Sequence, residues 1–166
     1  MSPDVLTFQF GIGGFVLARN LAGVTHAESL QAPPQGGNTL NWMVGHVTRA
    51  RNQALGLIGV TPLYDDAAFS NYGPRFDPAG ALPLDEIVAR FTALGSALSA
   101  ALAGVGAERL AAPAPFSPSG NPQETIGTLL ASIAFHEAYH LGQTGLSRRL
   151  LGHRGALPAP GEAGHD

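Results

Sequence analysis

The feature that most constrains the fold is a long run of apolar residues between positions 84 and 105. They recur at steps of three and four, so on a helix they form one continuous stripe: Leu84, Ile87, Val88, Phe91, Leu94, Leu98, Leu102 and Val105. A stripe of this length has to be covered by other secondary structure. No segment shows the alternation of period two that is typical of strands. We therefore predict an all-α protein.

Two further segments have clear helical periodicity, at 39–58 and at 125–151. Either Asn38 or Thr39 is a suitable N-cap for the first, because a short polar side chain there accepts a hydrogen bond from a free backbone amide. Gly152 follows the second, and glycine is common just after the end of a helix. Both segments are long enough to cross a small domain from end to end.

A fourth segment, at 6–30, has a weaker helical pattern. Gly11, Gly13 and Gly14 lie within it, and each costs about 1 kcal/mol relative to alanine in a helix. With this segment included, the chain contains four helices of similar length. We predict a four-helix bundle.

The domain organisation follows from where these segments lie. With 166 residues the chain is long enough for one domain with a real core. We predict a single bundle over 1–154 and a flexible Pro/Gly-rich tail over 155–166. Two long connecting loops, at 61–83 and 106–124, join the helices, and loops of this length often carry function.

The composition excludes several classes of protein. Nine basic residues, all arginine, stand against twelve acidic ones, and the net charge of −3 gives no basic surface for nucleic acid. The apolar stretch 8–18 is too short to span a membrane and lacks a basic flank, so we expect no membrane partner and a cytoplasmic location. Since there is no cysteine, any sulfur chemistry requires a small-molecule thiol.

A polar row interrupts the apolar face of segment 125–151. His136 and His140 are four residues apart, so on a helix they lie one turn apart on the same face and can reach one metal ion. Ser132, Gln143 and Ser147 share that face. Buried polar groups are costly unless each has a partner, and a metal site would satisfy them. The alternative is two core histidines that are hydrogen-bonded to their neighbours.

Residues 136–140 also match H-E-x-x-H, the zincin pattern in which the glutamate is a general base. A metzincin would have a third histidine at the position of Leu146. A thermolysin-like site would need a downstream glutamate, and only Glu162 in the tail follows. The pattern therefore argues only weakly for a peptidase. Glu137 is instead interpreted as a solvated or salt-bridged carboxylate, or as lining of the pocket.

His46 ends the motif N-W-x-x-G-H at positions 41–46, and H-E-x-x-H-x-G-Q-x-x-x-x-R-R occupies 136–149. Together the two motifs resemble the DinB/YfiT-like superfamily, in which four-helix bundles, often dimeric, hold a metal ion with three histidines. The resemblance implies that His46, His136 and His140 are the metal ligands. It also implies a homodimer.

Other polar residues near these motifs are candidates for the pocket. Tyr139 and Gln143 lie close to the ligands along the helix and are predicted to line the pocket. Arg51 falls within the apolar arc of segment 39–58. Either its stem is buried while the guanidinium pairs or reaches solvent, or it binds a substrate carboxylate. The positive charges of Arg148 and Arg149 either interact favourably with the dipole at the C-terminal end of their helix or bind an anionic thiol.

The predicted centre is an open one. Three neutral imidazoles leave a divalent ion such as zinc, nickel or iron with free coordination positions, as in catalytic sites. The resemblance to thiol-dependent enzymes favours a metal-dependent S-transferase that joins a low-molecular-weight thiol to a small-molecule substrate. A metal-dependent small-molecule hydrolase and a non-enzymatic, stress-associated metal-binding protein remain alternatives. The other histidines, His26, His153 and His165, are interpreted as structural or exposed.

Overall fold

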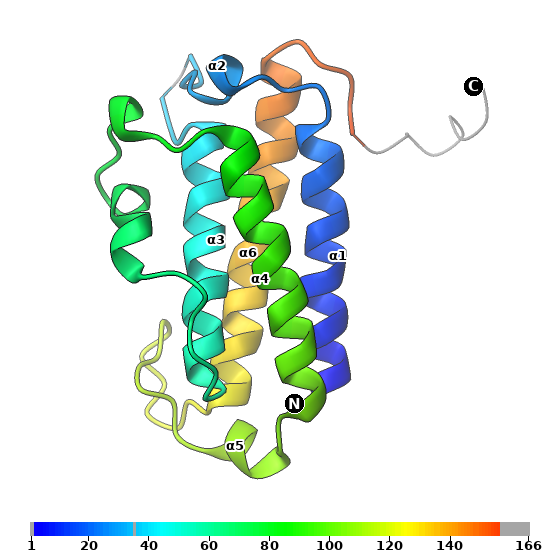
Figure 1. Ribbon diagram of the computed structural model, residues 1–166, viewed down its shortest axis with the longest axis vertical. Coiled ribbons are helices and arrows are strands. Elements are labelled where there is room, and N and C mark those ends of the chain that lie inside the picture. The colour runs from blue at the N-terminus through cyan, green and yellow to red at the C-terminus, as the bar shows by residue number, and fades with distance from the viewer. Residues whose placement is uncertain (1, 35, 157–166) are drawn as a thin grey trace, which may run out of the picture.

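Four long helices pack side by side in the computed structural model, which describes residues 2–34 and 36–156 (Figure 1). They are α1 (Pro3–Leu21), α3 (Leu40–Leu57), α4 (Leu84–Gly104) and α6 (Ile126–Leu150). The described residues contain no strand, only an isolated bridge between Pro113 and Thr125. The predicted all-α four-helix bundle is confirmed. From residue 157 onward, the predicted tail lies outside the described residues.

The helices run in the order up, down, down, up (Figure 1). In this view α1 and α6 ascend together, and Asn20 near the end of α1 hydrogen-bonds Leu141 in the second half of α6. α3 and α4 both descend, so the chain between them must return along the whole bundle. A helix of 18 residues is about 27 Å long. The long predicted loop is therefore a crossover, and it contains the short 3₁₀ helices η1 (Asp66–Tyr72) and η2 (Pro78–Gly80).

Three of the predicted helices begin and end within one residue of where the pattern placed them. The side chain of Thr39 accepts a hydrogen bond from the Trp42 amide at the start of α3. Thr125 and Thr128 cap the start of α6 reciprocally. Because these caps are local in sequence, the boundaries could be predicted from the residues alone.

The predicted helix at 6–30 is wrong in extent, because the structure divides it into two. α1 ends at Leu21, and the short helix α2 (His26–Ser29) follows. Gly23 between them has φ +75°, a left-handed conformation that ends a helix. Thr25 then starts α2 through a capping box with Glu28. This box could have been recognised in the sequence.

Apolar side chains from all four long helices form one core. The stripe of α4 contributes six buried residues, as the pattern predicts: Leu84, Ile87, Phe91, Leu94, Leu98 and Leu102. By length and composition alone, α4 is also apolar enough to cross a membrane. Within the bundle, its stripe packs against α1 and α3. The short helix α5 (Ala107–Ala111) follows α4 and packs against α6.

Candidate metal centre

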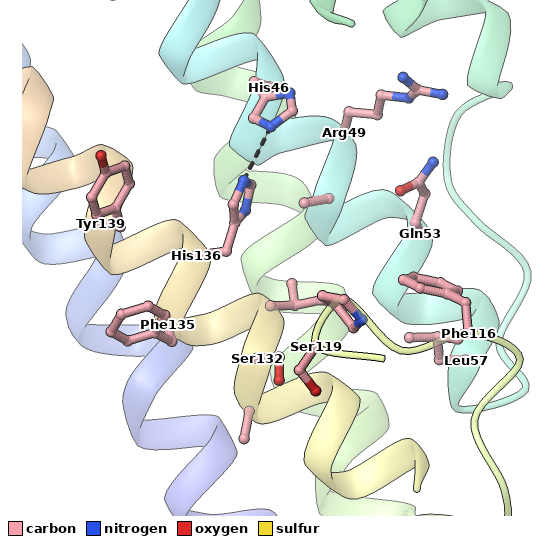
Figure 2. Close-up of a pocket in the computed structure, with 14 residues that line it drawn as sticks. His46, Arg49, Gln53, Leu57, Phe116, Ser119, Ser132, Phe135, His136 and Tyr139 are labelled. Atoms are coloured by element: carbon pink, nitrogen blue, oxygen red, sulfur yellow. Dashed lines mark hydrogen bonds between the residues drawn. The ribbon is translucent and has the colours of Figure 1, made fainter. Parts of the chain in front are cut away.

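Three histidines meet where α3 faces α6. The Nε2 atoms of His46 and His136 are 3.1 Å apart (Figure 2). One ligand atom from each of His46, His136 and His140 lies within 4.8 Å of the other two. His136 and His140 lie one turn apart on α6. The structure places them next to His46, which comes 90 positions before His136 in the sequence. Helical periodicity alone could not make that connection.

The orientation of His46 is fixed by the crossover. Its Nδ1 lies 2.9 Å from the carbonyl oxygen of Tyr72. A carbonyl only accepts, so Nδ1 carries the proton and donates, which leaves the lone pair on Nε2. The Trp42 ring stacks on the imidazole at a centroid distance of 4.4 Å. Nε2 therefore faces the other two histidines.

The motif at 41–46 has a physical explanation, because Asn41, Trp42 and Gly45 hold the crossover against α3. Asn41 accepts a hydrogen bond from the Tyr72 hydroxyl, and the Trp42 indole donates to the carbonyl of Gly73 at 2.8 Å. A Cβ on Gly45 would lie only 2.1 Å from the Tyr72 ring. The glycine lets the ring approach, and the carbonyl of the same tyrosine then orients the histidine.

The two histidines of α6 are held in their neutral form. His140 Nδ1 donates to Oε1 of Gln143 at 2.8 Å, so its Nε2 also carries a lone pair. Burial first, and then charge repulsion from the neighbouring His140 and His46, together lower the pKa of His136 to about 4. Burial also lowers the pKa of His140, and the hydrogen bond that His140 donates to Gln143 opposes this shift. Neutral imidazole is the form that binds metals.

These residues fit a divalent metal ion. Two nitrogens that each lie about 2.1 Å from one ion, at ligand angles of about 90–110°, are about 3.0–3.4 Å apart. The separation of 3.1 Å between His46 and His136 falls in that range. The hydrogen bonds at Nδ1 of His46 and His140 are of the kind that orients metal-bound imidazoles.

Comparison with known proteins places this arrangement in a family. Residues 16–144, which include all three histidines, match the DinB superfamily. The chain belongs to the DinB superfamily. The resemblance inferred from the two motifs is therefore confirmed.

A crystal structure described as the conserved protein of locus from Enterococcus faecalis is similar to this DinB protein. The TM-score is 0.70, the match covers 91% of this chain and 98% of that chain, and the sequences are 18% identical. At that identity the likeness shows a common fold alone. No curated protein matches the sequence.

In this DinB protein the glutamate of H-E-x-x-H is bound to an arginine. Both side chains are 2% exposed, and Nε and one terminal nitrogen of Arg51 each donate to Glu137 at 2.6 Å. Burial raises the pKa of Glu137, and the hydrogen bonds and charge of Arg51 oppose that rise. The salt-bridged interpretation of Glu137 is confirmed. The solvated alternative is wrong, because the carboxylate is buried against Arg51, and Glu137 is not among the residues that line the space beside the histidines.

Arg51 is likewise not part of the metal pocket. The carboxylate that it binds belongs to the protein, and the same terminal nitrogen also donates to the Phe10 carbonyl. Its guanidinium carbon lies 3.7 Å from the centre of the Phe91 ring. The interpretation of a buried stem with a paired guanidinium is confirmed. Arg51 was also considered as a clamp for a substrate carboxylate, but it is not among the residues that line the space beside the histidines.

Two glycines make room for this ion pair. A Cβ on Gly13 would lie 2.1 Å from a carboxylate oxygen of Glu137, and one on Gly95 would lie 2.6 Å from a terminal nitrogen of Arg51. Gly13 is one of the three residues that weaken the helical pattern of the first segment. Its cost to helix propensity is offset by the close approach that it allows between α1 and α6.

A groove of about 1170 Å³ lies beside the histidines, between α3 and α6. Its lining includes the following side chains: His46, Arg49, Gln53, Leu57, Phe116, Ser119, Ser132, Phe135, His136 and Tyr139 (Figure 2). Tyr139 lies where the sequence predicted it. Gln143 does not line the groove, but contacts the site through His140.

Several residues of this groove were not predicted from the sequence. Arg49 and Gln53 follow His46 by three and seven positions on α3, so helical spacing could have revealed them. Arg49 also donates to Asp66 of the crossover at 2.7 Å. Phe116 comes from the connection between α5 and α6, and no local pattern indicates where it lies.

Among the described residues, the other predicted positions lie away from the groove. His153 pairs with Glu28 at 3.2 Å, His26 is exposed, and His165 lies outside the described residues. Arg148 donates to the carbonyls of Asn20 and Ala22 at the end of α1. It therefore stabilises the contact between the ends of α1 and α6.

Proposed function

We propose that this DinB protein binds one divalent metal ion through His46, His136 and His140. The observation that supports the proposal is the convergence of three imidazoles, of which two donate through Nδ1 and so keep a lone pair on Nε2. Imidazole nitrogens suit zinc, nickel and iron, and protein geometry selects among these metals only in part.

We further propose that the protein is a metal-dependent S-transferase that uses a low-molecular-weight thiol. A divalent ion with three neutral protein ligands keeps its full charge and open coordination positions, and so lowers the pKa of a thiol that binds there. In the reaction, the thiol loses its proton to water. Its sulfur forms a bond to an electrophilic carbon of the substrate, and the bond to the leaving group breaks. The sulfur must come from a cosubstrate because the chain has no cysteine.

The groove supports a small organic electrophile as the second substrate. Leu57, Phe116 and Phe135 give it apolar walls that exclude water from the substrate. Arg49 and Gln53 lie along one side, and the N–H groups that they do not donate to Asp66 can donate to polar groups of a ligand. The net charge of −3 supports small molecules rather than nucleic acid as partners, and we propose that the protein works in the cytoplasm.

Elemental analysis of the untagged protein tests the metal proposal. We expect about one ion per chain in the wild type and almost none in His46→Ala or His140→Ala, because each loses one of three ligands. His153→Ala is the matched control, since that histidine pairs with Glu28 away from the groove, and it should keep the ion. Full occupancy in the His46→Ala variant would contradict the three-histidine site.

The reaction is tested with cobalt-substituted protein. An S-transferase predicts that the cobalt absorption spectrum changes when a thiol is added, and that thiol is consumed with an electrophile. Hydrolysis of esters or amides without thiol would instead establish a hydrolase. If neither assay responds and metal removal unfolds the bundle, the ion is structural, as in the stress-associated alternative.

Gln143→Leu is expected to weaken metal binding about 10–100-fold, because the partner of a ligating histidine fixes its orientation and proton position. A competition titration against a coloured chelator measures the affinity. Gln53→Leu is the control, since Gln53 lines the groove and bonds Asp66 without contacting a histidine. Equal affinities for the two variants would show that the hydrogen bond to His140 does not orient the ligand.

A further inference from the structure

A second groove lies between α1 and α4, on the side of the bundle opposite the histidines. These two helices pack against each other, α1 also packs against α6, α4 packs against α3, and α3 packs against α6. The α1–α4 pair therefore lies across the bundle from the α3–α6 pair. The space has about 770 Å³, within the range of roughly 300–1,000 Å³ that is usual for small-molecule sites. We call it the α1–α4 groove and define it by six of the residues that line it: Gly11, Gly14, Ala18, Gly95, Ser96 and Ser99.

Small residues open this groove. Gly11, Gly14 and Ala18 follow one another at steps of three and four, so they lie on one side of α1. A Cβ on Gly11 or on Gly14 would meet no atom within 4 Å. The close approach that explains Gly13 therefore does not explain these two glycines. Each costs about 1 kcal/mol of helix propensity relative to alanine, and what each contributes is open space beside α1.

Arg51 reaches this groove across the core from α3, and it is the one charged side chain among the described residues that line it. The side chain is 2% exposed. Its Nε and Nη2 donate to Glu137, and Nη2 also donates to the Phe10 carbonyl, which uses three of its five N–H groups. No atom in the described part of the chain accepts from Nη1. A Cβ on Gly95 would lie 2.6 Å from Nη1, so this free donor lies at the wall of the α1–α4 groove.

The hydrogen bonds that Arg51 already makes indicate which acceptor fits. Its charge is balanced by Glu137, so a carboxylate in the groove would take a second negative charge out of water without a positive partner of its own. Both hydrogens of Nη2 are in use, so the fork of two nitrogens that binds both oxygens of a carboxylate is not available. We propose that the α1–α4 groove binds an uncharged, largely apolar small molecule whose carbonyl oxygen accepts a hydrogen bond from Nη1 of Arg51.

The walls of the α1–α4 groove favour an apolar body for this ligand. Phe10 and Leu17 line it from α1, and Val88 and Phe91 line it from α4. Water also accepts from Nη1 of Arg51. A ligand with an apolar body accepts the same hydrogen bond and in addition removes apolar surface from water, which is favourable. None of the described residues that line this groove is a histidine, so the proposal is independent of the metal site.

Fluorescence titration with prodan tests the site without reference to metal or activity. Prodan is an uncharged naphthalene ketone whose emission moves to shorter wavelength in apolar surroundings. The groove beside the histidines also has apolar walls, so the titration is made on Ser132→Phe, which fills that groove, as well as on the wild type. We expect both proteins to give a saturable emission shift.

Ser96→Phe, added to Ser132→Phe, fills the α1–α4 groove and is expected to abolish this shift. Circular dichroism checks that the helices are intact, and Ser99→Phe, one turn further along α4, takes its place if Ser96→Phe unfolds the bundle. No saturable shift in Ser132→Phe, or a shift that survives in the double variant, would overturn the proposal.

Two analogues of prodan test the chemistry of the acceptor. Combining Arg51→Met with Glu137→Leu removes the donor and its counter-charge together, and this change, made in Ser132→Phe, is expected to weaken prodan binding about 10-fold. Dimethylaminonaphthalene, which has the same rings without the ketone, should bind equally well with and without the change. An equal loss for both probes would overturn the hydrogen bond from Nη1. The corresponding naphthoate is expected to bind Ser132→Phe more weakly than prodan does, and tighter binding of the naphthoate would overturn the assignment of an uncharged ligand.

Discussion

Glu137→Leu is expected to lower the free energy of unfolding by about 3–5 kcal/mol, because it leaves the charge of Arg51 buried without its partner. Both side chains are 2% exposed, so water cannot replace the lost carboxylate. The effect would be among the largest that a single substitution causes in a domain of this size. Urea unfolding followed by circular dichroism measures it directly.

The double variant Arg51→Met with Glu137→Leu is the control for this prediction. Since it removes both charges and keeps similar volumes, it should be more stable than either single variant. A cost below about 1 kcal/mol for Glu137→Leu would show that the pair is not desolvated. Unchanged stability together with loss of hydrolytic activity would contradict the structural role, and would favour the general base of H-E-x-x-H.

Gly45→Ala is expected to disturb the fold and the metal centre together. Its Cβ would lie 2.1 Å from the Tyr72 ring, so the ring and the backbone that carries it must move. Overpacking of this kind costs about 1–3 kcal/mol of stability. The Tyr72 carbonyl orients His46, so we also expect metal affinity to fall about 10–100-fold. Urea unfolding and chelator competition measure the two effects.

Gly56→Ala is the matched control on the same helix. A Cβ there would meet only Pro62, at an ordinary contact distance of 3.8 Å. This variant should be slightly more stable, by up to about 1 kcal/mol, because alanine is the better helix former. If Gly45→Ala behaves in the same way, the close packing of Tyr72 on α3 does not hold His46 in place.

The parts of the fold that depend on neighbours in sequence could be predicted. Periodicity and caps gave three of the four long helices to within a residue, because Thr39 and Thr125 act on amides only three positions away. The pairing of His136 with His140 is equally local. His46 was connected to them only through resemblance to a family. The structure supports that step by bringing the three rings together.

The parts that depend on contacts between distant segments could not be predicted. Whether Arg51 binds a substrate or a side chain depends on α6, which lies 86 positions away along the chain. The course of the crossover depends on the parallel descent of α3 and α4, which no local pattern indicates. Loop residues such as Phe116 reach the groove through tertiary structure alone.

The histidines and the far wall of the groove are supported by separate stretches of chain. Hydrogen bonds that His46 and His140 donate to Tyr72 and Gln143 orient the two rings, whereas Phe116, Pro118 and Ser119 of the α5–α6 connection line the groove. That connection can therefore be exchanged or lengthened without disturbing the ligand set. One set of histidines is thus compatible with different far walls, and grafting a single loop is expected to change which molecules the groove accepts.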